Sequence, residues 1–325
     1  MNVLITSASR KVGLVRAFQD ALARTGGGKV VAVDSSPLSP ALLVADERAI
    51  VARGEASDFL PTLHYLCKKH EIGLLVPTRD EELPIFAAEK AAFAAQGVVV
   101  LVSSPQAVAT CQDKRAFVEF CAREGFATPR TWAQGARPPA STFPLFAKPR
   151  YGKGARGAAP VTTLEELELV LARDPEAIVQ ELVTAPELTI DLFADLQGQV
   201  VSVVPRYRTR VVGGESFVSR TVKSARLLDE AAAVARSLGL VGHNTIQCFF
   251  SDGDCKLIEI NPRFGGAASL GFAAGAPTPE FSVRVALGQR VAPRIGEFTD
   301  DLVMLRYTED RFIAGSALDA MGGTS

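Results

Sequence analysis

Residues 256–266 read KLIEINPRFGG and alternate apolar with polar side chains until a proline ends the pattern. Because successive side chains of a β-strand point to opposite faces, Glu259 and Asn261 share one face and the two isoleucines share the other. Carboxylate and amide oxygens are hard ligands of the kind that Mg²⁺ prefers. Arg263 follows the proline, in position to meet an anion. Taken alone, an ordinary edge strand with solvated polar residues explains this pattern better.

A glycine loop forms the second signal, at residues 146–157 (FAKPRYGKGARG). Backbone N–H groups of such a loop can turn toward an anion, and lysine charges can approach the same phosphates. The loop is not a P-loop, because G-x-x-x-x-G-K-[ST] is absent and predicted strands flank it on both sides. A solvated surface hairpin is an equally good explanation. The candidate phosphate contacts are Lys148, Gly152, Lys153, Gly154 and Gly157.

The third signal is the run IVQELV at residues 178–183, with Glu187 following a Pro186 bend. A strand that leads from one lobe to the next can pair its backbone with an adenine edge, and a nearby carboxylate can accept ribose hydroxyls. An interdomain linker with a surface acid fits equally well.

The first hundred residues alternate strand-like and helix-like patterns, which predicts a parallel, doubly wound sheet. Asp34 ends the second predicted strand, where a dinucleotide-binding fold places its ribose acid. The first turn, residues 6–13, holds one glycine where G-x-G-x-x-G needs three. A pyrophosphate therefore cannot approach the backbone closely, and we expect a Rossmann-like domain without a dinucleotide. After Glu187 the pattern becomes mainly antiparallel, so the fold class is α/β with an α+β C-terminal part.

Composition narrows the class of protein. The chain has 325 residues, a formal charge of −1 and 47% hydrophobic residues, which is an ordinary globular balance. A pI near 6.4 without a long basic run disfavours nucleic-acid or membrane-surface binding. No apolar run approaches the roughly 18 residues that span a bilayer, and no signal peptide is expected. Five scattered cysteines without a CxxC pair indicate reduced thiols in a cytoplasmic protein.

In this order along the chain, the three signals resemble the ATP-grasp superfamily, and most of all its carbamoyl-phosphate synthetase large-chain and carboxylate–amine ligase branch. The resemblance implies a Rossmann-like domain over residues 1–108. It further implies a linker helix and small lid subdomain over residues 109–184, and a large subdomain over residues 185–325 that ends in a frayed tail. One departure is Ala155, where a serine is common in the family's glycine loop.

The same resemblance implies roles for single residues. Lys114 and Lys148 are similar to the lysines that approach the ATP phosphates, and Arg263 to the arginine that faces the transferring phosphate and the substrate. The implied adenine hinge is Glu181, Leu182 and Val183, the ribose acid is Glu187, and the metal ligands are Gln247, Glu259 and Asn261. ATP and two Mg²⁺ ions are the implied cofactors, with Mn²⁺ as an alternative metal.

The resemblance implies an ATP-dependent ligase that forms an acyl phosphate from a carboxylate, releases ADP, and lets an amine capture the acyl group. The partners expected are therefore small-molecule carboxylate and amine substrates, without nucleic acid or membrane. The alternatives are a carbamoyl-phosphate-synthetase-like enzyme that phosphorylates bicarbonate or carbamate, and a non-catalytic ATP sensor. The sequence gives no oligomeric state, although a homodimer is compatible with it.

Substrate recognition is the least defined part of this interpretation. Arg206, Arg208 and Arg210 alternate on a predicted strand, so all three would share one face. A cationic face suits a substrate carboxylate or phosphate, and Gly213–Gly214 could flex over a ligand. A solvated strand edge protected by charge is an equally good explanation.

The hairpin around Asp252–Gly253 makes a geometric demand. Gln247 and Glu259 can serve one metal only if both point to the same side of the sheet. A two-residue loop would pair Gln247 with Ile258 on the apolar face. We therefore expect a three-residue loop, residues 251–253, with a G1 bulge at Gly253, which pairs Gln247 with Leu257 instead.

Overall fold

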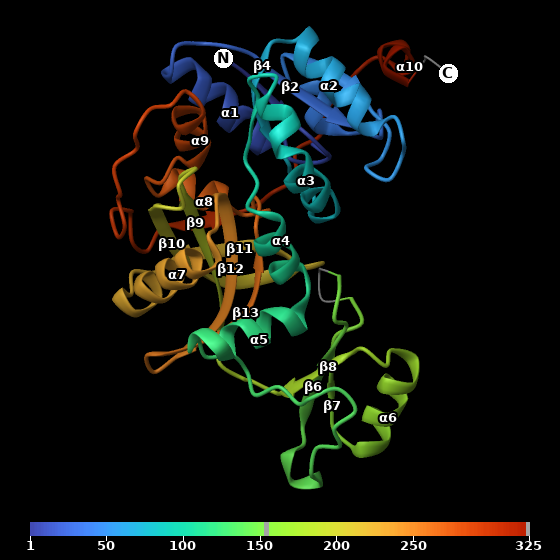
Figure 1. Cartoon of the computed structure of the whole chain (residues 1–325), viewed down its shortest axis with the longest axis vertical. Coiled ribbons are helices and arrows are strands. Elements are labelled where there is room, and N and C mark those ends of the chain that lie inside the picture. The colour runs from blue at the N-terminus through green and yellow to red at the C-terminus, as the bar shows by residue number, and fades with distance from the viewer. Residues whose placement is uncertain (153–155, 323–325) are drawn as a thin grey trace.

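The N-terminal domain is built on a five-stranded parallel sheet with strand order β3-β2-β1-β4-β5, as the sequence pattern predicts. The computed structural model describes residues 1–152 and 156–322 (Figure 1). Short β-branched runs form the buried strands, and amphipathic segments form the helices between them. The strands are β1 (Asn2–Ile5), β2 (Val30–Asp34), β3 (Glu47–Ile50), β4 (Ile72–Val76) and β5 (Val99–Val100), and the helices are α1 (Val12–Arg24), α2 (Phe59–Lys69) and α3 (Leu83–Ala94). Two short 3₁₀ helices, η1 (Pro40–Leu43) and η2 (Asp80–Glu82), complete the domain.

Strand β3 and helix α4 (Pro105–Gln112) are among the elements that are absent from the sequence prediction. Strand β3 (ERAI) pairs with β2 at the sheet edge, and its polar, half-exposed pattern gives no apolar run to detect. Helix α4 begins at Ser104, whose hydroxyl accepts a hydrogen bond from the N–H of Ala107 at 3.2 Å. A serine N-cap followed by proline at the first helical position is a typical start of a helix, so the sequence contained a signal for α4.

The small lobe lies at the end of the molecule opposite the N-terminal domain (Figure 1). Its antiparallel sheet has the order β7-β6-β8 and carries one helix, and α5 leads into it. Side-chain caps begin both helices: the Asp113 carboxylate accepts from the N–H of Arg115 at the start of α5, and the Thr163 hydroxyl accepts from that of Glu166 in α6. The elements are α5 (Lys114–Glu124), η3 (Ala140–Thr142), β6 (Leu145–Lys148), β7 (Ala159–Val161), α6 (Leu164–Arg173) and β8 (Ile178–Glu181).

The large C-terminal part is a six-stranded antiparallel sheet with the order β13-β12-β9-β10-β11-β14. One face is apolar and packs on α7 and α5, with Leu188, Ile190 and Ile246 at its centre. The opposite face carries polar side chains. The elements are β9 (Glu187–Ala194), β10 (Val200–Val212), β11 (Glu215–Thr221), α7 (Ala225–Leu238), β12 (Gly242–Ser251), β13 (Asp254–Asn261), α8 (Ser269–Ala273), α9 (Thr278–Ala286) and β14 (Val303–Leu305).

The β12–β13 hairpin corrects the loop prediction. Ser251 pairs with Asp254, so the loop has two residues, and both Asp252 (φ +52°) and Gly253 (φ +86°) are left-handed, as a type I′ turn requires. The bulge lies further along the ladder: Cys248 pairs with Leu257, but Gln247 pairs with Glu259. Ile258 is the extra residue.

This bulge reverses the inside–outside alternation of β13 between Leu257 and Glu259. Leu257 is 1% exposed and joins Ile260 in the apolar core, whereas Ile258 is half-buried. The expectation that Ile258 and Ile260 share the core face is therefore wrong. The requirement that Gln247 share a face with Glu259 is met, by a different register from the one predicted.

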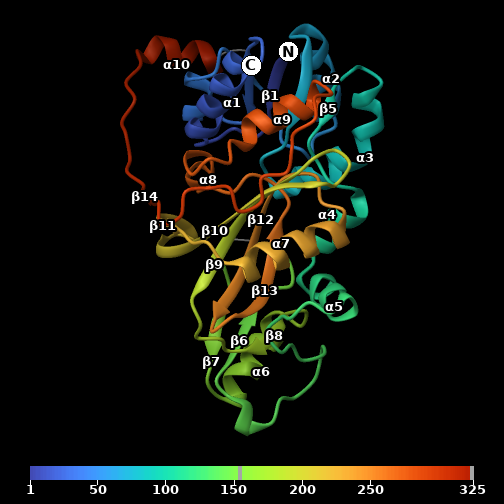
Figure 2. The same cartoon turned by 90° about the vertical axis from the view of Figure 1, so that its left-hand side faces the viewer.

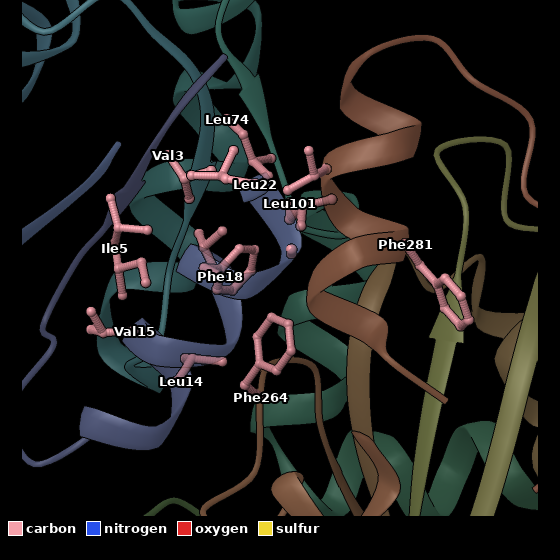
Figure 3. Packing of buried hydrophobic residues seen from close by; sticks show 14 of the residues in the cluster. Val3, Ile5, Leu14, Val15, Phe18, Leu22, Leu74, Leu101, Phe264 and Phe281 are labelled. Carbon is pink, nitrogen blue, oxygen red and sulfur yellow. The ribbon is translucent and has the colours of Figure 1, made fainter. Parts of the chain in front are cut away.

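A hydrophobic cluster joins the N-terminal domain to the large part (Figure 3). Phe18 of α1 meets Phe264 edge-to-face, with ring centroids 5.7 Å apart, and Phe281 of α9 packs on Phe193 of β9. Val3, Ile5 and Leu14 belong to the same buried cluster. These two parts of the chain consequently share one core.

After β14 the chain runs back along one side of the molecule to the N-terminal domain (Figure 2). Most of the segment predicted to be a frayed tail forms a helix, α10 (Gly315–Gly322). Ala317 and Leu318 donate backbone hydrogen bonds to the carbonyl of Ala314 at its start. The frayed-tail expectation is corrected for these residues.

The bulge predicts unequal losses of stability for two neighbouring substitutions. Leu257→Ala should lower the free energy of unfolding by about 2–5 kcal/mol, because it opens a cavity in the core. Ile258→Ala should cost less than half of that, because Ile258 lies outside the core. Urea unfolding of both variants measures the difference. A larger loss for Ile258→Ala would contradict the register.

Candidate active site

The polar face of the large sheet gathers the predicted metal ligands. Antiparallel partners lie on the same face, and Gln247 pairs with Thr189 on one side and with Glu259 on the other. Asn261 pairs with Thr245 one step along the same strands. One carboxylate and two side-chain amides therefore lie on one face of two paired strands, although their spacing on β13 alone could not establish this.

Arg263 continues this row at the end of β13. Its guanidinium donates to both carboxylate oxygens of Asp80, at 2.7 Å from Nε and 2.6 Å from Nη2. Nη2 also donates to Oδ1 of Asn261 at 3.2 Å, and Nδ2 of Asn261 donates to Oε1 of Glu259 at 3.2 Å. A chain of hydrogen bonds thus runs from the N-terminal domain to the carboxylate of the predicted metal site.

A cavity of about 220 Å³ lies in front of these residues. Glu259 and Asn261 line it from β13, Asp80 from η2, and Lys114 and Gly152 from the start of α5 and of the glycine loop. Residues predicted from three separate stretches of sequence therefore meet at one cavity. Asp80 is the addition that sequence reasoning missed, since an acid within the charged run RDEE carries no distinguishing signal.

Lys148 ends β6 and is only 7% exposed. The pKa of its ammonium falls from 10.5 to about 8, chiefly because burial disfavours the charge. The nearby charge of Lys114 acts in the same direction, while the carboxylates of Glu259 and Glu187 oppose the shift. A buried lysine between two carboxylates and a second lysine is the environment expected at a site for a polyanion, whose charge would stabilise the protonated form.

The start of α5 is tied to the small lobe through Asp113. Arg150 donates from Nε to Oδ1 of Asp113 at 2.9 Å and from Nη2 to Oδ2, and the Tyr151 hydroxyl donates to Oδ2 at 3.2 Å. The bonds from Arg150, together with those from the backbone N–H groups of Ala116 and Arg115, lower the pKa of the Asp113 carboxyl from 3.8 to about 2. In the next residue, Nζ of Lys114 donates to the carbonyl of Gly152 at 2.8 Å. The lysine predicted to approach phosphate is thereby held against the first glycine of the loop.

Two of the loop glycines have backbones that favour glycine. Gly152 has φ +104° and Gly157 has φ +74°, and a Cβ on Gly157 would lie 3.1 Å from Cγ of Pro149. Lys153 and Gly154, the other two predicted contacts of this loop, lie outside the described residues, as does Ala155.

The predicted hinge follows β8. Glu181 is half-buried, and its Oε1 accepts from Nζ of Lys256 at 2.6 Å and from the N–H of Arg130 at 3.0 Å. Leu182 and Val183 are half-buried in the passage to β9. Glu181 thus ties the small lobe to β13.

The arginines of β10 do not form one cationic face. Arg208 and Arg210 pair with Ser219 and Val218, which are neighbours on β11, so a bulge turns Arg210 to the opposite face. Arg206 is 2% exposed and donates from Nε to Asp191 at 2.8 Å. The prediction of a single shared face is wrong.

Arg208 occupies the polar face together with Glu187, and the two form an ion pair. Its Nη2 also donates to the carbonyl of Gly214 at 2.9 Å, and Gly213 and Gly214 both adopt left-handed backbones at the hairpin tip. The two residues predicted to meet ribose and substrate are therefore partners of each other here.

The donor set fits magnesium better than a transition metal. Within the described ranges, no three His, Cys, Asp or Glu side chains group as a metal site. Gln247, Glu259 and Asn261 offer one carboxylate and two amide oxygens, and Mg²⁺ commonly takes few protein oxygens and fills its remaining positions with phosphate and water.

Among the helices of residues 1–152 and 156–322, none is long and apolar enough to cross a membrane.

Comparison with known proteins agrees with this geometry. A family model described as "PylC-like, N-terminal domain" matches residues 3–101, and one described as "ATP-grasp in the biosynthetic pathway with Ter operon" matches residues 173–309. The carbamoyl phosphate synthase large chain of Methanosarcina barkeri is 26% identical over 235 residues, which are 65% of this chain. Residues 173–309 thus match an ATP-grasp family model, and the chain is similar to carbamoyl phosphate synthase large chains. It spans only 22% of that relative's own length.

Solved structures show the same fold. The biotin carboxylase domain of Hydrogenobacter thermophilus 2-oxoglutarate carboxylase, in complex with MgADP, ADP and bicarbonate, has a TM-score of 0.72 at 16% identity, covering 93% of this chain and 73% of that one. The L-amino acid ligase of Bacillus licheniformis has a TM-score of 0.68 at 17% identity, covering 88% and 74%. These likenesses confirm the predicted fold class.

The hydrogen-bonded ion pair between Asp113 and Arg150 predicts that the free energy of unfolding depends on pH. The carboxyl pKa of about 2 in the folded protein lies below the 3.8 of an unperturbed aspartate, so its contribution is present above about pH 4 and is lost as the pH falls toward 2. Asp113→Asn keeps a good helix cap but removes the charge. The stability difference between wild type and Asp113→Asn, measured by urea unfolding, should shrink over that window. If the free energies of unfolding of the two proteins changed with pH in parallel, the proposed contribution of this ion pair would be contradicted.

Proposed function

We propose that the protein is an ATP-dependent ligase that activates a carboxylate as an acyl phosphate and joins it to an amine or a similar nucleophile. The observation that carries the proposal is the convergence of Lys114, Gly152, Glu259 and Asn261 on one cavity between the small lobe and the large sheet. Lys148, buried and close to Glu259, adds a second positive charge there. Two lysines opposite a row of oxygen ligands is an arrangement suited to a metal-bound triphosphate.

The proposal assigns the nucleotide to the junction of the small lobe and the large sheet. Adenine would lie against the backbone of Glu181, Leu182 and Val183, and Glu187 would accept the ribose hydroxyls, exchanging Arg208 for the sugar. Lys114, Lys148 and the glycine loop, with Lys153 and Gly154 included, would hold the phosphates. Because the Arg208 side chain is only 9% exposed, separating this pair would leave a largely buried charge without its carboxylate, so the bound nucleotide would have to satisfy the guanidinium in turn.

Gln247, Glu259 and Asn261 would hold magnesium, and two ions is the number that we propose. The metal supplies charge neutralisation of the phosphate oxygens. The chain's own part is positional: Lys148 and Lys114 hold the phosphates in line with the acceptor, and Arg263 faces the carboxylate that attacks.

In the proposed reaction a carboxylate oxygen forms a bond to the γ-phosphorus while the bond from that phosphorus to the bridging oxygen of ADP breaks. An amine then attacks the acyl carbon, loses a proton, and inorganic phosphate leaves with the electrons of the broken C–O bond. The site must exclude water, which would otherwise hydrolyse the acyl phosphate. A cytoplasmic location belongs to the proposal, supported by five buried free thiols.

A second candidate is phosphorylation of bicarbonate. The synthases that match this chain are named for carbamoyl phosphate, and the Hydrogenobacter carboxylase domain binds bicarbonate. Bicarbonate presents the same planar carboxylate to Arg263 as a larger acid does. The two candidates differ in the substrate that stimulates ADP release.

The ligase proposal is tested by ADP release with Mg²⁺ and pooled carboxylates and amines, against bicarbonate with ammonia or carbamate alone. We expect stimulation by particular organic pairs, and near-complete loss of turnover in Glu259→Gln and Asn261→Ala with an unchanged unfolding midpoint. Asp195→Asn, on the β9–β10 turn, is a matched control that should keep full activity. Binding of ATP without turnover on any pair would favour a sensor, and unchanged turnover in Glu259→Gln would sink the metal assignment.

Lys148 predicts how nucleotide affinity depends on pH. Its ammonium, with a pKa of about 8, loses its charge as the pH rises through that value, so the affinity for MgATP should fall by up to about tenfold per pH unit above it. Lys148→Arg stays charged throughout, so its affinity should be flat over the same range. Calorimetric titrations from about pH 7 to 9.5 would decide this. A wild-type profile as flat as that of Lys148→Arg would remove Lys148 from the phosphates.

A further inference from the structure

Asp80 belongs to the N-terminal domain, yet it binds the side chain of Arg263, which the proposed reaction places opposite the attacking carboxylate. The Asp80 carboxylate and the Arg263 guanidinium form a two-point pair, and their side chains are 18% and 16% exposed. Such a paired geometry fixes both the direction and the plane of a guanidinium. The pair also connects two domains that are far apart in the sequence.

The N-terminal domain fixes the position of Asp80 in turn. Asp80 opens η2, and its backbone carbonyl accepts a hydrogen bond from Nε2 of Gln112 at the end of α4. Two residues later Glu82 is only 3% exposed, and it accepts hydrogen bonds from the hydroxyls of Thr6, at 2.8 Å, and Ser7. The η2 segment is therefore anchored on both sides of the Asp80 side chain.

These anchors explain the first βα turn, which lacks the glycines of a dinucleotide site. Its hydroxyls are used by Glu82 instead of by a pyrophosphate. Ser7 has φ +48° and Ser9 has φ +46°, which are left-handed values that a non-glycine residue adopts only when its surroundings require it. Thr78 donates from its hydroxyl to the carbonyls of Thr6, at 2.7 Å, and Ser7, at 2.9 Å. The strained turn and η2 form one hydrogen-bonded unit.

Arg263 keeps the capacity to bind an anion while Asp80 holds it. A guanidinium has five N–H groups, and four hydrogen bonds are formed: two to Asp80, one to Oδ1 of Asn261, and one from Nη1 to the carbonyl of Phe264. The second N–H of Nη1 has no acceptor among the described residues. The guanidinium is thus oriented but not saturated.

We infer that Asp80 is a positioning residue. Through Asp80, the N-terminal domain acts in the reaction by holding Arg263 beside the predicted metal ligands Glu259 and Asn261. This inference rests on the proposed function for its kinetic consequence, but the positional claim stands on the geometry alone. In this inference Asp80 acts through Arg263.

The kinetic test is a double-mutant cycle of Asp80→Asn and Arg263→Lys. Asp80→Asn should lower kcat by about ten- to a hundredfold with the KM for ATP nearly unchanged, because a displaced guanidinium affects the transition state more than nucleotide binding. In the Arg263→Lys background the same change should cost less than about twofold, because Asp80 then has no guanidinium to orient. Losses that multiply, or a kcat unchanged or raised in Asp80→Asn, would overturn the inference.

Glu280→Gln is the matched control. Glu280 of α9 pairs with Arg24 of α1 at 3.7 Å, so this change removes another ion pair between the same two parts of the chain, away from the cavity. Its kcat should stay at the wild-type value, and both variants should unfold at similar temperatures. An equal fall of kcat in Glu280→Gln would show that Asp80 merely stabilises the domain contact, and would overturn the inference.

A second readout works without turnover, so failure of the proposed function is distinguishable from failure of this inference. Phenylglyoxal modifies accessible guanidinium groups, and peptide mass spectrometry gives its rate at each arginine. Arg263 should react severalfold faster in Asp80→Asn than in wild type, while Arg10, whose side chain is 81% exposed, should react equally in both. Equal rates at Arg263 would refute the positional claim whatever the enzyme's substrate. An inactive wild type with a faster Arg263 in the variant would refute only the proposed reaction.

Discussion

The site depends on one residue that does not fit the ladder of β12 and β13. A two-residue turn sets the register of this hairpin. Without a bulge at Ile258, Gln247 would pair with Ile258, and Glu259 would share the core face with Leu257. With the bulge, the strand presents Leu257 to the core and Glu259 to the cavity. A strictly alternating strand cannot do both, so the packing of the sheet and the row of oxygen ligands rely on the same irregularity.

A second dependence runs through the N-terminal domain, which is Rossmann-like in topology and different at its crevice. The buried carboxyl of Glu82 has a raised pKa because burial disfavours its charge, and the hydroxyls of Ser7 and Thr6 partly offset that effect. The end of the sheet where a dinucleotide would bind is thus occupied by the protein's own hydrogen bonds. The fold is shared with nucleotide-binding domains, whereas the local chemistry supports a neighbouring site.

The sequence predicted what local pattern determines. The parallel sheet and the antiparallel sheet follow from the periodicity of apolar residues, and both are present. What failed depends on pairing between strands. The location of the hairpin bulge and the orientation of Arg210 are set by partners across the sheet, which one strand's alternation does not contain.

The candidate site divides in the same way. Gly152, Glu259 and Asn261 were identified because their motifs are compact, and Lys114 was identified through the family resemblance. All four line one cavity. Asp80 was missed because its importance arises from Arg263, 183 residues later in the chain. Arg206 was a candidate contact for substrate, with a solvated strand edge as the alternative, because sequence cannot show that its charge is balanced by buried Asp191. Long-range pairs of opposite charge are what a single sequence conceals.

The aromatic contact between Phe18 and Phe264 has a consequence for how this architecture can evolve. Phe264 follows Arg263 directly in the chain. The N-terminal domain therefore contacts two consecutive residues of this loop, Phe264 by ring packing and Arg263 by an ion pair. An N-terminal domain exchanged for that of a distant relative would have to match both contacts at once. We therefore expect the two domains to be inherited together, because a substitution on one side of their contact restricts the substitutions accepted on the other side. The small lobe has a hydrophobic core of its own, so its sequence is freer to change.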